Sequence, residues 1–402
     1  MIDSILSKIR RFIPSHIFSL FQPIYHYKLS LLAAIFYGFP SRKIKVIGVT
    51  GTKGKSTTVE IINAILEGAG YKTALSNTIR YKIGNQSTTN KFKMSMPGRF
   101  FIQKLIRKAV DEKCDYIILE MTSQGVAQYR HRFIDLDALV FTNLSPEHIE
   151  SHGSYERYRD AKLEIALQLS KSSKRPRIMI VNGDDKESEK FLAFPAEIKN
   201  KFNINENIAT PLMGEFNKYN VLGAVTLCRA LGIKEDIIKK AIINFKEVPG
   251  RVESIDCGQD FKVIVDYAHT VDSLEKLYIT FPGRKICVLG GTGGGRDSWK
   301  RKEMGRVADQ YCDEIILTDE DPYDEDPQKI VTDVNEGIKN KKAKIIMDRR
   351  QAIREALKMA RRDDAVLITG KGTDPYIMGQ NGTKVPWDDA TVAREELGNI
   401  GN

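Results

Sequence analysis

Short runs of apolar, often β-branched residues alternate with longer amphipathic stretches from Lys43 onward. The short runs predict buried strands over residues 45–50, 116–121, 138–143 and 178–182. The longer stretches predict helices over residues 57–70, 99–113, 155–170 and 218–231. Alternation of this kind is typical of an α/β domain built on a parallel sheet.

A second series of the same kind follows a Pro249-Gly250 turn. Its strands are predicted over residues 261–266, 285–289, 314–318, 344–347 and 365–369. A predicted helix over residues 233–245 ends just before the turn, and proline and glycine both disfavour its continuation. We therefore expect two α/β domains that meet near residue 249.

The first forty residues are rich in Ile, Leu, Phe and Tyr and include the basic residues Lys8, Arg10 and Arg11. Pro14 and Pro23 interrupt this stretch, which leaves residues 29–39 as a mainly apolar run that is too short to span a bilayer. We favour a pair of short helices packed on the next domain. The alternative is a helix on a membrane surface, with peripheral contact through residues 1–40.

The composition limits the class of protein and its partners. The chain is 42% hydrophobic and 28% charged, as in globular proteins, and its net charge of +10 favours anionic partners. Because no basic stretch interleaved with aromatic residues is visible, we expect no nucleic-acid partner. The five cysteines are scattered, odd in number and free of C-x-x-C spacing, which favours a reducing, cytoplasmic location.

The strongest local motif is a glycine-punctuated loop between the first predicted strand and helix. It contains the candidate nucleotide-binding residues Gly51, Thr52, Lys53, Gly54, Lys55, Ser56 and Thr57. Backbone N–H groups of such a loop approach phosphate oxygens, Lys55 neutralises the β and γ phosphates, and the Ser56 hydroxyl binds Mg²⁺. Val49 stands where the general P-loop has its first glycine, so the motif is a variant.

Further motifs follow this T-G-T-x-G-K-S-T loop in order along the chain. They lie at residues 120–125, 142–148, 151–153, 161–162, 182–185, 214–220, 249–253, 266–270, 290–297 and 370–372. In this order they resemble the Mur ligase family, whose members add amino acids to peptidoglycan precursors, and the related folylpolyglutamate synthases. The similarity is greatest to the tripeptide synthetase branch, which adds the third residue of the stem peptide.

The resemblance implies a fold and an activity. The fold would be a central P-loop-type parallel-sheet ATPase domain over residues 43–248, a smaller Rossmann-like α/β domain over residues 249–402, and a short helical amino-terminal segment. The activity would be ATP-dependent ligation of a carboxylate to an amine through an acyl phosphate. The implied partners are ATP, an amino acid and a muramoyl-peptide-like carboxylate, with two Mg²⁺ ions.

The resemblance also assigns roles to single residues. Ser56, Glu120 and His148 would bind Mg²⁺, and Lys55, Glu120, His148 and His269 would act in catalysis. Asn217 and Asn220 would contact adenine, Arg251 the γ phosphate and Asp266 the ribose. Closure of the two domains would bring the last two into place. His269, Arg296, Lys300 and Arg301 would close over the ligands, although Lys300 and Arg301 also fit surface ion pairs.

Lys162 falls in an apolar stripe. Tyr155, Tyr158, Ile165 and Leu169 repeat around it at three- and four-residue spacing. An ammonium on a buried face needs compensation, or it extends to solvent along its apolar stem. The resemblance implies that Lys162 is carbamylated, which would give it a carboxylate for catalysis and Mg²⁺ binding.

The chain departs from the tripeptide synthetases in two places. Those enzymes begin with a UDP-binding domain of roughly a hundred residues, which we expect to be lacking here. The diaminopimelate-adding enzymes carry Asp-Asn-Pro-Arg where this chain has residues 319–324, D-E-D-P-Y-D, and Tyr323 has no guanidinium for a carboxylate. The candidate amino-acid site comprises Arg296, Asp319, Asp321, Tyr323, Gly370 and Asp374, an acidic set that favours lysine.

Three alternatives stay open. The first is a folylpolyglutamate-type ligase, and the second is a Mur-like ligase that acts on a lipid-linked acceptor. The third is a non-catalytic ATP-binding scaffold subunit. The complete set of predicted phosphate- and metal-binding residues argues against the scaffold.

Overall fold

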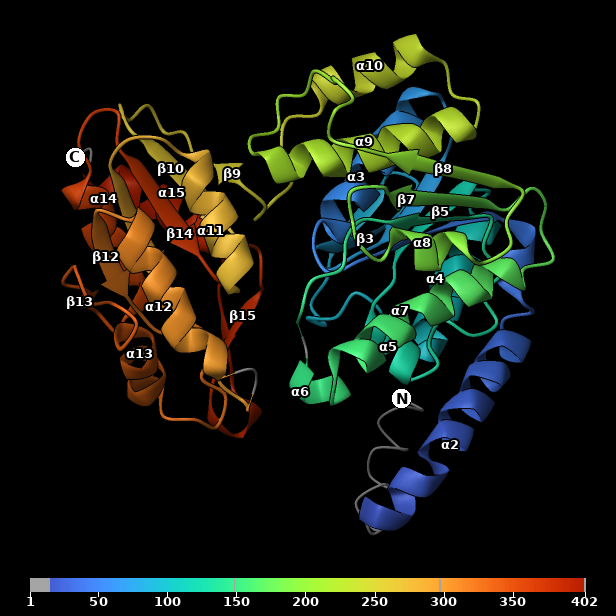
Figure 1. Cartoon of the computed structure of the whole chain (residues 1–402), viewed down its shortest axis with the longest axis horizontal. Helices are drawn as coiled ribbons and strands as arrows, with labels where there is room; N and C mark the ends of the chain where they lie inside the picture. The colour runs from blue at the N-terminus through green and yellow to red at the C-terminus, as the bar shows by residue number, and fades with distance from the viewer. Residues whose placement is uncertain (1–14, 148, 296–297, 401–402) are drawn as a thin grey trace. The chain divides into compact units, whose positions relative to one another are not determined.

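The computed structural model describes residues 15–147, 149–295 and 298–400 and divides into two compact units. The first unit comprises Met1–Ser145, Tyr155–Glu206 and Leu222–Lys240, and the second comprises Pro146–Ser154, Asn207–Val221 and Ala241–Asn402. Each unit has its own sheet flanked by helices (Figure 1). In the described part of the chain, no helix has the length and apolar character needed to cross a bilayer.

The first unit is built on an eight-stranded sheet of order β4-β3-β2-β5-β1-β6-β7-β8. The strands are β1 (Lys45–Thr50), β2 (Thr73–Ser76), β3 (Arg80–Ile83), β4 (Gln86–Thr89), β5 (Tyr116–Glu120), β6 (Ala138–Phe141), β7 (Ile178–Asn182) and β8 (Ile198–Phe202). All neighbours are parallel except the β2–β3 and β3–β4 pairs. The predicted parallel α/β sheet is confirmed, with an antiparallel edge that the sequence pattern did not indicate.

Helices surround this sheet. They are α2 (Ser15–Phe36), η1 (Pro40–Lys43), α3 (Lys55–Gly68), α4 (Arg99–Asp111), α5 (Ser123–Ala127), α7 (Tyr155–Ser170) and α8 (Ser188–Leu192). Helices α9 (Glu215–Ala230) and α10 (Glu235–Asn244) contain residues of both units, and α6 (Ile149–His152) falls in the second.

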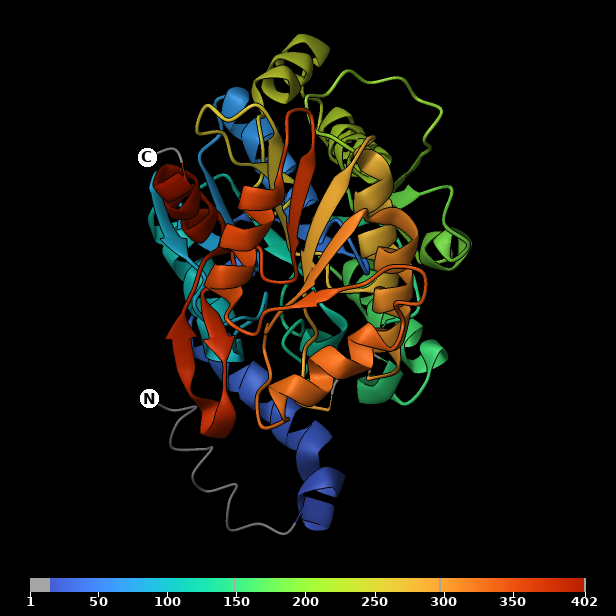
Figure 2. The ribbon, with the colours of Figure 1, turned by 90° about the vertical axis from the view of Figure 1, so that its left-hand side faces the viewer.

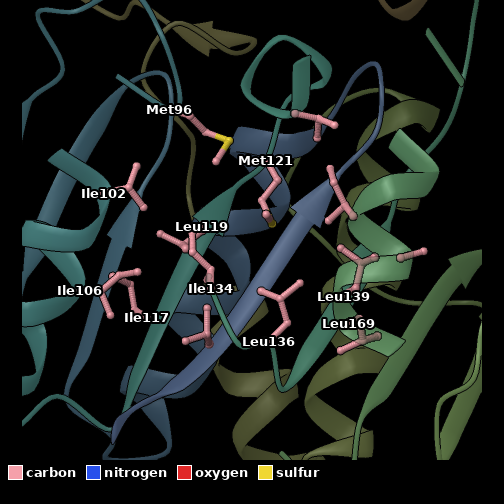
Figure 3. Packing of buried hydrophobic residues seen from close by; sticks show 14 of the residues in the cluster. Met96, Ile102, Ile106, Ile117, Leu119, Met121, Ile134, Leu136, Leu139 and Leu169 are labelled. Carbon is pink, nitrogen blue, oxygen red and sulfur yellow. The ribbon is translucent and has the colours of Figure 1, made fainter. Parts of the chain in front are cut away.

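The core of the first unit lies between the sheet and helices α4 and α7. Leu119 on β5 and Leu139 on β6, the two strands that flank β1, belong to one buried apolar cluster with Ile106 of α4 and Leu169 of α7 (Figure 3). Each such side chain contributes roughly 1.5–3 kcal/mol when it is fully buried. This packing fixes the carboxyl ends of β1 and β5, where the functional motifs begin.

The second unit has a six-stranded sheet of order β13-β12-β11-β14-β10-β9. The strands are β9 (Glu253–Ser254), β10 (Lys262–Asp266), β11 (Lys285–Leu289), β12 (Glu314–Leu317), β13 (Lys344–Ile345) and β14 (Ala365–Thr369). Within the described strands of this six-stranded sheet, only β9 runs antiparallel to its neighbour. Strands β15 (Tyr376–Met378) and β16 (Lys384–Pro386) form a separate hairpin around η2 (Gln380–Gly382).

Two apolar clusters of the second unit cover the two faces of its sheet. The helices are α11 (Val271–Thr280), α12 (Trp299–Tyr311), α13 (Pro327–Asn335), α14 (Arg349–Met359) and α15 (Asp389–Ile400). Figure 2 shows the strands of this sheet with helices on either side. This two-sided covering is the doubly wound arrangement expected of a Rossmann-like domain.

Two details differ from what the sequence indicated. Pro23 does not end a helix, because α2 continues through it from Ser15 to Phe36. Residues 1–14, where the rest of the expected pair of helices would lie, are outside the described residues. Pro23 is exposed, so water can bind the carbonyl group that a proline leaves without its helical partner. Cys287 and Cys312, 25 positions apart in the sequence, are joined by a disulfide with an S–S distance of 2.11 Å, a pairing that their spacing did not suggest.

Candidate active site

The phosphate loop connects the carboxyl end of β1 to the first turn of α3. Gly51 has a φ of +149°, and a Cβ atom there would lie 2.0 Å from Thr142 Oγ1. Gly54 precedes the helix with a φ of +79°. Both positions therefore require glycine. In this loop conformation the backbone N–H groups at the start of α3 lie together at one helix end, where anions bind favourably.

Neighbouring residues hold this loop in shape. Asn143 accepts from the Thr52 N–H at its carbonyl oxygen (2.8 Å) and from the Lys53 N–H at its side-chain oxygen (2.9 Å). The Thr142 hydroxyl donates to the Lys53 carbonyl oxygen at 2.7 Å. Both residues belong to a motif noted in the sequence, but their role in fixing the loop was not predicted.

Glu120, at the end of β5, lies directly beside the loop. The Ser56 hydroxyl donates to Glu120 Oε2 at 2.7 Å, and the Thr78 N–H donates to the same oxygen at 3.1 Å. The hydroxyls of Ser95 and Thr78 donate to Oε1 at 2.7 and 3.0 Å. Thr78 and Ser95 are contributors that sequence reasoning missed, because they lie in a different part of the chain.

The charge state of Glu120 follows from these contacts. Burial alone would raise the pKa of this carboxyl, but the positive charge of Lys55 and the hydrogen bonds from Ser95, Ser56 and Thr78 hold the pKa below its usual value. Glu120 is therefore a buried carboxylate at neutral pH. Lys55 itself donates to the Thr52 carbonyl oxygen at 2.7 Å, so its ammonium group lies at the loop.

Lys162 also reaches the phosphate loop. Its side chain is only 2% exposed, and its Nζ donates to the Gly51 carbonyl oxygen at 2.7 Å and lies 4.8 Å from the centroid of the Tyr158 ring. Tyr158, Ile165 and Leu169 are buried on the same helix. The predicted location of Lys162 within an apolar stripe is thus confirmed, and the extension to solvent is excluded.

The oxygen donors beside the loop fit a magnesium ion. Mg²⁺ prefers oxygen ligands, which include carboxylates, hydroxyls, phosphate and water. Ser56 supplies a hydroxyl oxygen and Glu120 supplies a carboxylate. A cage made by the protein alone is not found, since within residues 15–147, 149–295 and 298–400 no group of three His, Cys, Asp or Glu side chains can hold a metal. His148, the remaining predicted ligand, lies outside the described residues.

The predicted nucleotide-contacting residues of the second unit lie around the end of β10 and the start of α9. Asp266 accepts from the N–H groups of Val252 and Ala268, each at 2.7 Å. The Arg251 guanidinium lies 4.3 Å from the centroid of the Tyr267 ring. Asn220 donates to Asn217 at 2.9 Å, so the two amides form one pair. His269 Nδ1 lies 2.7 Å from the Tyr267 carbonyl oxygen.

The predicted acidic pocket contains a cation of the protein itself. The fully buried Lys371 donates to Asp321 Oδ1 at 2.8 Å and to Asp374 Oδ2 at 3.1 Å. These two carboxylates are therefore already compensated, which corrects the expectation that both face a substrate amine. Asp319 remains a candidate, and burial raises the pKa of its carboxyl. Tyr323 has a φ of +53°.

Glu320, which sequence reasoning did not select, lies against Gly370 of the candidate amino-acid site. Its side chain is 3% exposed, and the Thr292 hydroxyl donates to Oε1 at 2.8 Å. Within the part of the chain that the structure describes, Oε2 has no hydrogen-bond partner. A Cβ atom on Gly370 would lie 2.4 Å from Oε2, so Gly370 leaves the space that this carboxyl occupies. Burial raises the pKa of Glu320.

Arg301 is not a surface residue. It is 2% exposed and donates to Glu325 (2.7 Å), to Asp333 (2.9 Å) and to the Thr292 carbonyl oxygen (3.0 Å). Its guanidinium thus fixes the start of α12 through buried ion pairs, so the surface position considered from the sequence is wrong. Lys300 is buried as well, and Arg296 lies outside the described residues.

Comparison with known proteins agrees with this geometry. Residues 49–205 match the Mur ligase middle domain, and residues 250–372 match the domain described as Mur ligase, glutamate ligase domain. A UDP-N-acetylmuramoyl-L-alanyl-D-glutamate–2,6-diaminopimelate ligase of Syntrophomonas wolfei is 36% identical, with 92% of this chain and 81% of that protein covered. A UDP-N-acetylmuramyl-tripeptide synthetase of Roseiflexus sp. is 35% identical over 93% of this chain and 82% of its own length.

Solved structures show the same fold. A 2,6-diaminopimelate ligase structure has a TM-score of 0.60 at 25% identity and covers 89% of this chain and 79% of its own. E. coli FolC in complex with ADP has a TM-score of 0.68 at 20% identity and covers 93% of both chains. Since the loop and the buried carboxylate occur together with two matched domains, and relatives at 35–36% identity cover more than nine tenths of the chain, this protein belongs to the Mur ligase family.

Proposed function

We propose that the protein is an ATP-dependent, ADP-forming acid–amino-acid ligase that adds an amino acid to a muramoyl-peptide precursor of peptidoglycan. The observation that carries this proposal is the Ser56–Glu120 hydrogen bond of 2.7 Å beside a lysine-bearing phosphate loop. The names of the relatives, which are ligases of muramoyl peptides, support the same acceptor class. A cytoplasmic location, where ATP is available, follows from this activity.

The reaction brings two anions together, because a substrate carboxylate attacks the γ phosphorus of ATP. The loop N–H groups and Lys55 would offset this repulsion and stabilise the charge that develops on the transferred phosphoryl group. Mg²⁺, held by Ser56 and Glu120, would supply further positive charge. The bond from the γ phosphorus to the β-γ bridging oxygen breaks, ADP leaves, and an acyl phosphate remains. The amino group of the amino acid then displaces phosphate and forms the amide.

Lys162 would act as a carbamate. Carbamylation turns the amine into a carboxylate that binds Mg²⁺ and orients the substrate, and it leaves one N–H on Nζ. That N–H can keep the hydrogen bond to the Gly51 carbonyl oxygen, which is 2.7 Å away. We propose that the modified Lys162 and His148 complete the set of ligands for two metal ions.

The amino acid that we propose carries an amine but no second carboxylate, as lysine does. Tyr323 offers no guanidinium to a second carboxylate, and Asp319 and Glu320 lie near it in the sequence. Amino-acid-dependent phosphate release with L-lysine and with meso-diaminopimelate tests this choice. A preference for meso-diaminopimelate would overturn the choice of lysine and leave the ligase activity itself intact.

The direct test of function is to incubate the full chain with ATP, Mg²⁺, single amino acids and muramoyl-dipeptide acceptors. We expect ADP, phosphate and a product whose mass is that of the acceptor plus one amino acid, less water. Glu120→Gln should form product at least about 100-fold more slowly, whereas Glu112→Gln, which changes an exposed carboxylate at the end of α4, should behave like the parent. If the chain binds ATP but forms no product from muramoyl acceptors, dihydropteroate or lipid-linked acceptors, the result would favour a non-catalytic ATP-binding scaffold subunit.

A lipid-linked carboxylate is a second candidate acceptor. The observation that favours it is an exposed apolar face on helix α2, where Ile35 is 55% and Phe36 is 72% exposed. An acceptor carried by a membrane would be met by a protein that lies on that membrane. Comparison of kcat/KM for UDP-linked and lipid-linked forms of the same acceptor distinguishes the two candidates.

A further inference from the structure

Helix α2 is apolar on two opposite faces. One face packs on the first unit through His26, Leu29, Ser30, Ala33 and Ala34, all of which are buried. The Ser30 hydroxyl donates to the Tyr129 carbonyl oxygen at 2.8 Å, so the helix is seated firmly on the segment after α5. The inward face therefore has its partner within the unit.

The outward face has the composition of a buried one. At 100° per residue, its positions are Ile24, Tyr27, Lys28, Leu31, Leu32, Ile35 and Phe36. Tyr27 lies at the border of this face, with its ring against Tyr129 and Phe133 of the unit. Ile24 is 54%, Leu32 55%, Ile35 55% and Phe36 72% exposed, and Lys28 is the one charged residue among the seven. A helix packed on one side normally turns polar residues to water, so a face of this kind indicates a partner.

The apolar surface continues past the helix. The Phe36 ring lies 6.3 Å from the Phe100 ring at the start of α4, centroid to centroid. Figure 1 shows α2 along the edge of the first unit, with its amino-terminal turns extending beyond the helices that it packs on. The face is thus presented on a protruding element.

The charge around this face selects the partner. The segment from α2 through η1, residues 15–43, contains no Asp or Glu, and its charged residues are Lys28, Arg42 and Lys43. Arg42 is 61% exposed and is paired with Asp135, whereas Lys28 and Lys43 add net positive charge beside the apolar face. A second copy of the chain would bring like charges together, which disfavours self-association through this face. A surface that is apolar and negatively charged at its boundary satisfies both features.

We propose that the outward face of α2 docks on the surface of an anionic phospholipid bilayer. The apolar side chains enter the boundary between headgroups and acyl chains, and Lys28, Arg42 and Lys43 contact phosphate groups. The helix lies in the plane of the membrane and does not cross it. This docking does not depend on the ligase activity, and it would hold the enzyme at the membrane whatever acceptor it uses.

The test is flotation of the full chain with vesicles of phosphatidylcholine alone and of phosphatidylcholine mixed with phosphatidylglycerol. We expect binding to the mixed vesicles that weakens as salt is raised. The double variant Leu32→Gln with Ile35→Gln should bind the mixed vesicles at least about tenfold more weakly, because two apolar side chains no longer enter the boundary between headgroups and acyl chains. Glutamine keeps the helix propensity high, so the fold should persist, as circular dichroism can confirm.

A matched control is Ile243→Gln on α10, which replaces a comparably exposed isoleucine (64%) outside the face. This control should float like the parent. The proposal is overturned if the full chain does not bind mixed vesicles, or if the α2 variant and the control bind equally well. It is also overturned if sedimentation velocity without lipid shows a dimer that the α2 variant dissociates, because a second copy would then cover the face.

Discussion

The hydroxyl of Ser56, in the first turn of α3, donates to the carboxylate of Glu120, at the end of β5, across 2.7 Å. The two residues lie 64 positions apart in the sequence. They meet because β1 and β5 are parallel neighbours whose carboxyl ends share one edge of the sheet. A hydroxyl and a carboxylate at this edge, beside a phosphate loop, form the part of the site that would hold the metal.

Removal of either member should abolish most of the activity. We expect Ser56→Ala and Glu120→Gln each to lower kcat by about 100-fold or more, because each removes an oxygen that positions positive charge at the transferred phosphoryl group. Steady-state phosphate release at several Mg²⁺ concentrations measures this. The two changes together should cost little more than one of them, and full additivity would show that the residues act separately.

Lys162 offers a test of carbamylation. Lys162→Ala should lower kcat by about 100-fold or more, since the carboxylate of the carbamate would be lost. The parent enzyme, after dialysis against bicarbonate-free buffer at low pH, should regain activity when bicarbonate is added, and the variant should not. Lys171→Ala, one residue beyond the end of the same helix, serves as a control. An alanine variant with full activity, unresponsive to bicarbonate, would remove the carbamate from the mechanism.

Local sequence patterns were sufficient for the elements that carry the site. Strands β1 and β7 and helix α7 have the bounds that the pattern predicts, because each combines a periodic apolar pattern with clear ends. Strands β3 and β4 were missed. Their residues are mostly half-buried or exposed, so no alternation of apolar and polar positions marks them, and their pairing depends on the neighbouring β2.

Contacts between residues far apart in the chain could not be predicted from the sequence. Ser95 and Thr78 hold Glu120 across separations of 25 and 42 residues, and Lys371 reaches Asp321 across 50. Nothing local marks these partners, because the strand order of each sheet decides which ends meet. The acidic cluster at residues 319–321 therefore suggested a free pocket for an amine, whereas the fold fills part of it with Lys371.

Lys371 should be important for stability. Lys371→Met would leave the carboxylates of Asp321 and Asp374 buried without their cation, which we expect to lower the free energy of unfolding by about 3–5 kcal/mol. Urea denaturation followed by circular dichroism measures this. Addition of Asp374→Asn to Lys371→Met should recover part of the loss, because one uncompensated charge is removed. An unchanged urea midpoint in the single variant would contradict the buried ion pairs.

His131 should make the protein sensitive to mild acid. It is 1% exposed, and among the described residues neither ring nitrogen has a hydrogen-bond partner. Burial, with a smaller contribution from Arg132, lowers the pKa of this histidine from 6.5 to about 3. Below pH 6.5 the unfolded chain therefore takes up a proton that the folded chain does not, and the free energy of unfolding falls by about 1.4 kcal/mol for each pH unit toward pH 3.

The variant His131→Leu isolates this effect, since leucine fills a similar volume and does not titrate. The difference in unfolding free energy between the variant and the parent, measured by urea denaturation, should be constant above pH 7. It should then shift in favour of the variant by about 1.4 kcal/mol per pH unit between pH 6 and pH 4. All other titrating groups are shared and cancel in the difference. Parallel pH profiles would show that His131 is protonated in the folded chain, and hence that its ring has acquired a partner or contact with water.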